Sequence, residues 1–324
     1  MSATSTLNVR VARKRIEASD ICSFELVVQD GAPLPAFEPG SHIDVHLPAG
    51  ITRQYSLCND PAEAHRYLIA VLKDPASRGG SRALHDTVHE GDVLSIGAPR
   101  NHFALTQDAR RHLLLAGGIG VTPLLCMAEQ LAATGRAFEM HYCARSRERT
   151  AFVERIRTSA FAARVHFHFG DGAADERLEI ERLLASAEEG AHLYVCGPGG
   201  FMDAVLNAAR ALGWPAHRLH YEFFAAQAAS TSGDASFQVR LARSAKVVTV
   251  PADRTVAEAL ADEGVDVPVS CGQGICGTCL TRVLDGEPDH RDLYLSPDEQ
   301  ARNDQFTPCC SRAKSRMLVL DLYL

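Results

Sequence analysis

Three cysteines lie close together in a glycine-rich stretch near the C-terminal end of the sequence. The stretch reads Cys271-Gly-Gln-Gly-Ile-Cys276-Gly-Thr-Cys279, and Cys309 follows much later. The spacing C-x4-C-x2-C with a distant fourth cysteine is typical of a plant-type [2Fe–2S] cluster. The glycines between the cysteines let the backbone wrap tightly and bring N–H groups near the sulfurs. The pattern predicts a cluster-binding loop.

A zinc site and buried free thiols are the alternatives to a cluster. Zinc sites usually combine two C-x2-C pairs, and only one such pair occurs here, which disfavours zinc. Disulfides are also disfavoured, because the cysteines are bunched in a chain without a secretion signal. The fourth ligand stays open between Cys309 and Cys310, since spacing alone cannot choose between adjacent cysteines.

Composition indicates an ordinary globular protein of two or three domains, with 324 residues of which 46% are apolar. The sequence has no apolar stretch long enough to span a membrane and no signal-peptide core, so we expect a cytoplasmic protein without a membrane partner. A net charge of −7 argues against nucleic acid as a partner. Nothing in the sequence demands more than a monomer.

Hydrophobic periodicity divides the chain into three domains. Short alternating runs over residues 1–108 predict an antiparallel β-barrel. Strand-like and helix-like segments alternate over residues 109–226, which predicts an α/β domain with a parallel sheet. A small, polar stretch over residues 227–236 is typical of a linker, and residues 237–324 predict a small α+β domain with a hairpin and a helix that Thr255 caps and Gly264 ends.

Two polar segments of the predicted barrel are suited to bind a phosphate-bearing ligand. In Arg53-Gln-Tyr55-Ser56, strand alternation places a tyrosine on one face with an arginine and a serine nearby. Arg78-Gly-Gly80-Ser81 precedes a predicted helix, whose first amides can bind a phosphate. The alternative is that the first segment is only a strand and the second only a turn.

Two glycine turns each follow a predicted strand of the α/β domain. The first is Gly117-Gly118-Ile-Gly120-Val-Thr122-Pro123, and the second is Cys196-Gly197-Pro198-Gly-Gly. A strand, a glycine turn and a helix together form a typical pyrophosphate site. Neither turn is a full G-x-G-x-x-G motif, but both would open at the carboxyl edge of one sheet. Their joint occurrence predicts nucleotide binding there.

Taken together, these motifs resemble the phthalate dioxygenase reductase family, which also includes vanillate demethylase reductases. The resemblance runs from about Leu7 to Leu322, and the C-terminal position of the cluster domain favours the FMN-containing subgroup. It implies a β-grasp fold for the cluster domain and FMN in the barrel. The residues that it implies as FMN contacts are Arg53, Tyr55, Ser56, Arg78, Gly80, Ser81, Thr122 and Phe224.

The same resemblance implies a nicotinamide nucleotide at the two glycine turns. Its contacts would be Gly118, Gly120, Cys196, Gly197 and Pro198. The resemblance also selects Cys309 as the fourth cluster ligand, beside Cys271, Cys276 and Cys279. One departure concerns the nucleotide: Arg145 and Arg147 stand where NADH-preferring relatives often carry an acidic residue. An acid bonds the ribose hydroxyls of NADH, whereas arginine suits a 2′-phosphate. NADH remains the expected donor, with NADPH as the alternative.

The implied function is the reductase component of a two-component system whose partner is a Rieske-type terminal oxygenase. A hydride carries two electrons, whereas a [2Fe–2S] cluster takes one at a time, so the flavin is needed between them. No residue is expected to act as a catalytic acid or base. The rival hypotheses are an electron-carrier or docking module without nucleotide oxidation, and a stand-alone flavin reductase.

Overall fold

The computed structural model describes residues 6–75, 79–224 and 233–322. The chain forms two compact units, Met1–Phe224 and Ala225–Leu324. Arg78 and most of the predicted linker lie outside the described residues. In the ranges that are described, no helix has both the length and the apolar character needed to cross a membrane.

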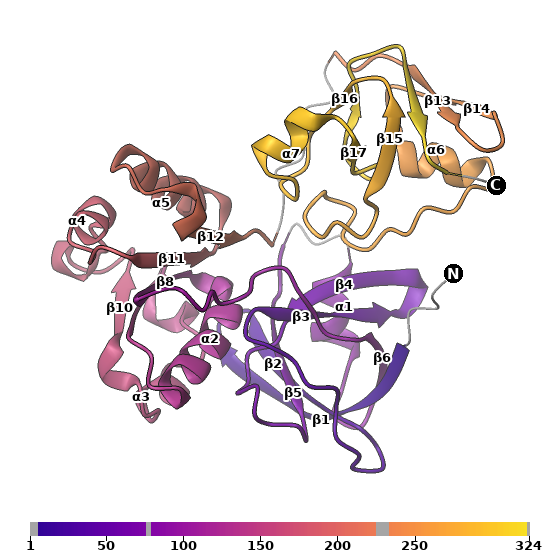
Figure 1. Cartoon of the computed structure of the whole chain (residues 1–324). Coiled ribbons are helices and arrows are strands. Elements are labelled where there is room, and N and C mark those ends of the chain that lie inside the picture. The colour runs from indigo at the N-terminus through magenta and orange to yellow at the C-terminus, as the bar shows by residue number, and fades with distance from the viewer. Residues whose placement is uncertain (1–5, 76–78, 225–232, 323–324) are drawn as a thin grey trace. The chain divides into compact units, whose positions relative to one another are not determined.

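The first unit begins with a seven-stranded antiparallel sheet in the order β4-β3-β6-β1-β2-β5, with β7 paired to β3 (Figure 1). A bridge between Leu57 and Ile69 joins the two ends of this path, and the sheet thereby closes into the expected barrel. Helix α1 (Gly80–Thr87) places Leu84 in the barrel core. The strands are β1 (Thr6–Ala18), β2 (Ile21–Val27), β3 (Ser41–Leu47), β4 (Ile51–Ser56), β5 (Tyr67–Leu72), β6 (Val93–Gly97) and β7 (Arg100–Asn101).

A five-stranded parallel sheet follows in the same unit, in the order β10-β9-β8-β11-β12. Strand addition reverses direction between β8 and β11, and ligands of open α/β sheets bind at such a switch point. The strands are β8 (Arg111–Gly117), β9 (Phe138–Ala144), β10 (Val165–Phe169), β11 (Ala191–Cys196) and β12 (Leu219–Glu222).

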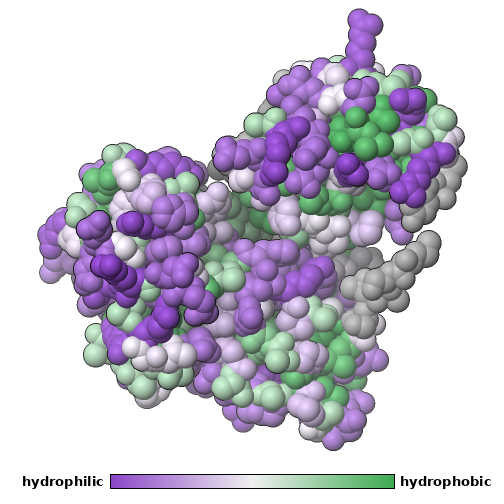
Figure 2. All heavy atoms as spheres, viewed as in Figure 1, coloured by the Kyte–Doolittle hydropathy of each residue, from purple (hydrophilic) through white to green (hydrophobic). Residues whose placement is uncertain are grey.

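Helices cover both faces of this parallel sheet (Figure 1). Helices α2 (Val121–Ala133) and α3 (Val153–Arg157) pack on one face, against side chains such as Leu114 and Met140. Helices α4 (Ile180–Ala185) and α5 (Gly199–Ala211) pack on the other, against Leu113 and Leu193. Figure 2 shows hydrophilic residues over much of the surface around α4 and β10.

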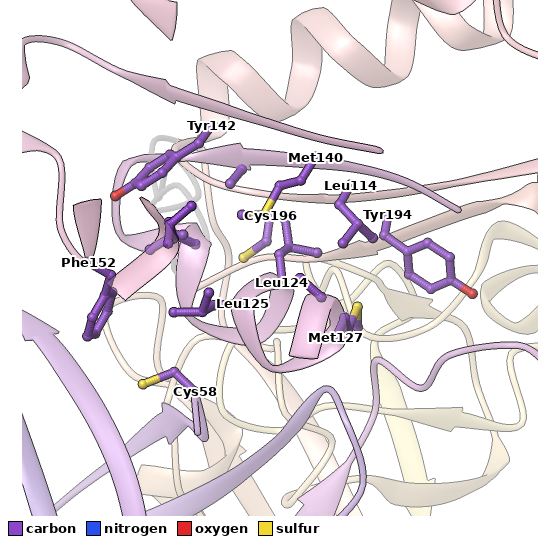
Figure 3. Close-up of a cluster of buried hydrophobic side chains, with 14 of the residues drawn as sticks. Cys58, Leu114, Leu124, Leu125, Met127, Met140, Tyr142, Phe152, Tyr194 and Cys196 are labelled. Atoms are coloured by element: carbon purple, nitrogen blue, oxygen red, sulfur yellow. The ribbon is translucent and has the colours of Figure 1, made fainter. Parts of the chain in front are cut away.

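The barrel and the parallel sheet share one hydrophobic core. Its barrel members include Ile21, Cys58, Leu68, Ala70 and Phe103, and they pack with residues of α2, β8 and β9. Figure 3 shows Leu124 and Leu125 of α2 between Cys58 on the barrel side and Met140 on the sheet side. This shared core holds β2 and β5 of the barrel against α2 and one face of the parallel sheet.

The second unit is a small mixed sheet with its own core. The sheet runs β14-β13-β19-β15-β17, and β13 and β19 are parallel while the other pairs are antiparallel. Helix α6 (Val256–Asp262) is capped by Thr255 in a capping box with Glu258, and Gly264 follows it at φ +78°, as expected. The other elements are β13 (Phe237–Leu241), β14 (Val247–Val250), β15 (Thr281–Asp285), β16 (Pro288–Asp289), α7 (Pro297–Arg302), β17 (Gln305–Phe306), β18 (Arg312–Ala313) and β19 (Met317–Leu320).

The predicted fold class is confirmed in all three parts. The barrel, the parallel α/β sheet and the mixed α+β sheet follow one another in the expected order. The hairpin that the sequence predicts after residue 236 is the antiparallel pair β13 and β14.

The shared core leads to a prediction for Leu125→Ala. Leu125 is fully buried, and truncating a buried leucine costs about 2–5 kcal/mol in unfolding free energy. Urea unfolding followed by fluorescence of Trp214, the single tryptophan of the chain, should show this loss. The control is Leu212→Ala, because Leu212 is 45% exposed. A similar, small loss in both variants would contradict the shared core.

Candidate functional site

The two glycine turns meet at the switch point of the parallel sheet. The first follows β8 and the second follows β11, which is its neighbour in the sheet. A Cβ atom built on Gly120 would lie 2.6 Å from the amide nitrogen of Gly197, and one built on Gly197 would lie 2.9 Å from Cα of Gly117. Real Cβ contacts are never so short, so only glycine allows the two backbones to come together.

Each turn leads into a helix of thirteen residues. Thr122 is buried in the first turn of α2, and its hydroxyl donates to the Ile119 carbonyl at 3.0 Å, which holds the glycine turn in place. Pro198 occupies the N-cap position of α5 in an extended conformation. Two helix N-termini beside each other are suited to bind a pyrophosphate.

The barrel meets this edge of the sheet through Ser56, at the end of β4. Its hydroxyl donates to Oε2 of Glu222 at 3.4 Å, and Glu222 ends β12. Cys196 ends β11 and pairs with Glu222 in the strand register. The structure thus brings Ser56 and Cys196, both identified in the sequence, together around a third residue that sequence reasoning missed. The only signal for Glu222 was one acid in an otherwise aromatic strand end.

Burial controls the protonation of this group of side chains. Partial burial raises the pKa of Glu222 to about 8, although the Ser56 hydroxyl partly offsets this effect. Burial also raises the pKa of the Cys196 thiol well above its usual value, and the Glu222 carboxyl raises it further. Both groups are therefore neutral at pH 7. A neutral thiol is a poor nucleophile, which agrees with a positioning role for Cys196.

Arg53, on β4, lies against the start of α1. A Cβ atom on Gly80 would lie 2.5 Å from Cγ of Arg53, so the glycine at the start of α1 leaves room for the arginine side chain. The Ser81 hydroxyl accepts a hydrogen bond from the Asp74 backbone amide at 3.2 Å. Burial of Tyr55 raises the pKa of its phenol, which keeps it neutral.

Phe224 ends the first unit, two residues after Glu222, and is 37% exposed. Its ring could therefore contact a planar ligand.

At the other side of the site, Arg145 and Arg147 follow β9, as the sequence predicts. Arg147 is bound by a carboxylate, that of Glu176.

In the second unit, the cluster cysteines come together from two segments. Thiol contacts join Cys271 to Cys276 and to Cys309, and Cys309 to Cys279. The Gln273 amide donates to the Cys271 sulfur at 3.3 Å, as expected for a loop wrapped around sulfur ligands. The glycines of the loop have positive φ.

The donor set fits two irons better than one metal ion. The thiols come from two segments of the chain and contact one another in a line. A [2Fe–2S] cluster distributes its four thiolates over two irons. Cys310 contacts only the last thiol of this line, that of Cys309, and is also hydrogen-bonded to the Thr307 hydroxyl at 3.3 Å. Cys309, by contrast, contacts two of the other three thiols.

Glu222 leads to a prediction about pH. Its pKa in the folded state lies above the ordinary carboxyl value, so its contribution to stability is present at low pH and is lost as pH rises through about 8. Between pH 6 and 9 the first unit should lose on the order of 2 kcal/mol through this group. The urea concentration at the unfolding midpoint, followed by Trp214 fluorescence, should fall less between pH 6 and 9 in Glu222→Gln than in the unmodified chain. Equal falls in both proteins would show that Glu222 does not titrate in this range.

Two family models match parts of the chain. Residues 239–314 match the 2Fe-2S iron-sulfur cluster binding domain. Residues 98–219 match the N-terminal domain of the dimethylamine monooxygenase subunit DmmA and its relatives. The first match covers all four cysteines of the line described above.

Full-length relatives cover nearly the whole chain. The vanillate O-demethylase oxidoreductase of Pseudomonas putida is 59% identical over 96% of this chain and 98% of its own length. The solved structure of phthalate dioxygenase reductase, described as a modular structure for electron transfer from pyridine nucleotides to [2Fe–2S], has a TM-score of 0.76 at 42% identity, with 98% of each chain covered.

A third match is to an intact type IV self-sufficient cytochrome P450 monooxygenase, with a TM-score of 0.86 at 40% identity. It covers 98% of this chain but only 41% of the P450 chain, so the whole of this chain corresponds to one part of that enzyme. These similarities extend over both units described above. The chain belongs to the family of oxygenase and demethylase reductases that includes phthalate dioxygenase reductase and vanillate O-demethylase oxidoreductase.

Proposed function

We propose that this chain is the NADH-dependent, FMN-containing reductase of a Rieske-type O-demethylase that acts on a methoxylated aromatic acid such as vanillate. The proposed substrate is supported by the 59% identity to a vanillate O-demethylase oxidoreductase, against 42% for phthalate dioxygenase reductase. The reductase would act as a monomer in the cytoplasm, where thiols stay reduced.

The observation that carries this proposal is the position of Ser56. It ends a barrel strand and touches the nucleotide-binding edge of the sheet through Glu222. A flavin in the barrel and a nucleotide at the glycine turns would therefore meet beside Ser56, Cys196 and Glu222. When bound, the flavin supplies the conversion between a two-electron hydride donor and a one-electron cluster.

The first unit's own residues would position the two ligands. Arg53 would offer its guanidinium to the FMN phosphate, with Gly80 and Ser81 at the start of α1, and Arg78 belongs to the same proposed group. Tyr55, Ser56, Thr122 and Phe224 would lie near the ring system. The backbone of Gly118, Gly120, Gly197 and Pro198 would bind the nucleotide, and the neutral Cys196 thiol would pack beside its nicotinamide.

In the second unit, Cys271, Cys276, Cys279 and Cys309 would hold the cluster. Its loop carries small side chains, so the cluster would lie close to the surface where a partner can dock. The partner would be the terminal oxygenase, which alone contacts the aromatic substrate.

Anaerobic titration of the purified holoprotein with NADH, and separately with NADPH, tests the proposal. We expect NADH to bleach the flavin and iron–sulfur absorbance together, because both groups lie on one electron path. If neither nucleotide bleaches either band, the docking-module hypothesis replaces this one. If flavin is released on reduction and the cluster stays oxidised, the chain is a flavin reductase.

Cys276→Ser tests the proposed cluster ligands. Loss of one thiolate should abolish the iron–sulfur spectrum while NADH still reduces the flavin, because the second unit has its own core. Cys310→Ser is the matched control, since Cys310 contacts Cys309 and the Thr307 hydroxyl but is not one of the four proposed ligands. A normal cluster spectrum in Cys276→Ser, or a lost one in Cys310→Ser, would overturn the assignment.

A further inference from the structure

A carboxylate that sequence reasoning did not single out holds Arg147 at the edge of the parallel sheet. Arg147 forms an ion pair with Oε1 of Glu176, and its guanidinium lies 4.2 Å from the centre of the Phe169 ring. The other carboxylate oxygen of Glu176 accepts a hydrogen bond from the Ala173 backbone amide at 3.1 Å. A Cβ atom on Gly172 would lie 3.1 Å from Cβ of Glu176, so the glycine makes room for this side chain. Glu176 is thus anchored through both oxygens.

This ion pair lies where the adenosine end of a nucleotide would bind. β9 ends at Ala144 and β10 ends at Phe169, both at the carboxyl edge that carries the glycine turns. β9 is the direct neighbour of β8 in the sheet. In doubly wound sheets, the residues at the end of this second strand meet the ribose of a nucleotide whose pyrophosphate lies at the first turn.

We propose that Glu176 determines the choice of nucleotide by holding Arg147 and excluding a 2′-phosphate. This inference rests on the proposed function, because it concerns the donor of that reaction. The arginine that sequence alone would assign to NADPH is already neutralised by a carboxylate. A 2′-phosphate would have to break this ion pair and would also meet the negative charge of Glu176, whereas the hydroxyl of NADH is free of both costs.

Other charges near the ion pair provide a matched control. Arg145, Asp171 and Asp175 belong to the same two loops, and Asp175 is exposed in the short helical turn Ala174–Glu176 that also holds Glu176. Asp175→Asn removes the same charge as Glu176→Gln, one residue away. It therefore separates a specific contact with Arg147 from a general change of local charge.

The experiment measures kcat/KM for NADH and NADPH with the holoprotein and ferricyanide as the electron acceptor. In Glu176→Gln the NADPH/NADH ratio of kcat/KM should rise about tenfold or more, because Arg147 becomes free to bind the 2′-phosphate. Asp175→Asn should change the ratio less than about twofold. The double variant Arg147→Ala/Glu176→Gln should lose the gain, since the cation that causes it is removed.

A second readout follows binding without turnover. Inhibition by adenosine 2′,5′-bisphosphate should strengthen in Glu176→Gln, and by a larger factor than inhibition by ADP. A purely structural role of Glu176 would move both inhibition constants alike.

The outcomes separate this inference from the proposed function. If the unmodified holoprotein oxidises NADH but Glu176→Gln changes neither the ratio nor the selective inhibition, Glu176 has no such role and the proposed function stands. An equal gain in Asp175→Asn would also overturn the role of Glu176. If the unmodified holoprotein oxidises neither nucleotide, the proposed function fails and this inference fails with it.

Discussion

The close approach of two backbone turns is the constraint on which the first unit depends. Gly120 and Gly197 leave no room for a side chain between β8 and β11, so the starts of α2 and α5 lie beside each other. The strand order requires this approach, because β8 and β11 are neighbours on either side of the switch point. The barrel supplies the opposite wall, and the shared core around Leu124 and Leu125 keeps that wall in place.

Burial at the junction of the barrel and the parallel sheet favours uncharged side chains. Ser56 and Cys196 are buried and Glu222 is half-buried, and the pKa values of the carboxyl and the thiol are both raised, which favours their neutral forms at pH 7. Uncharged, preorganised side chains can orient the ligands without exchanging protons with them. The ionic pair of Arg147 and Glu176 lies further out, where charge can select between nucleotides without disturbing the reacting groups.

The second unit has its own hydrophobic core, which brings the cluster cysteines together. Its loop must bring thiols from residues 271–279 together with the thiol of Cys309, and α6 and the mixed sheet hold both segments. Arg312, which follows the last cysteines, contacts Asp234 at 3.4 Å, and Arg291 binds the same carboxylate at 2.9 Å through Nη1. These ion pairs fix the chain after the cluster cysteines to the first residues of the unit.

The sequence by itself determined the local features of this protein. Cysteine spacing predicted the cluster loop, glycine turns after strands predicted the nucleotide edge, and the capping box at Thr255 located α6. Each of these signals depends on residues that are near one another in the chain.

Only the tertiary structure decided which distant residues meet. Cys309 contacts the thiols of Cys271 and Cys279, a choice that the family resemblance implied and that spacing left open. Glu222 reaches Ser56 from another sheet, and Glu176 binds an arginine from a neighbouring loop. No periodicity or spacing encodes these contacts, because burial and charge pairing between separate elements arise only when the sheets and their cores have formed.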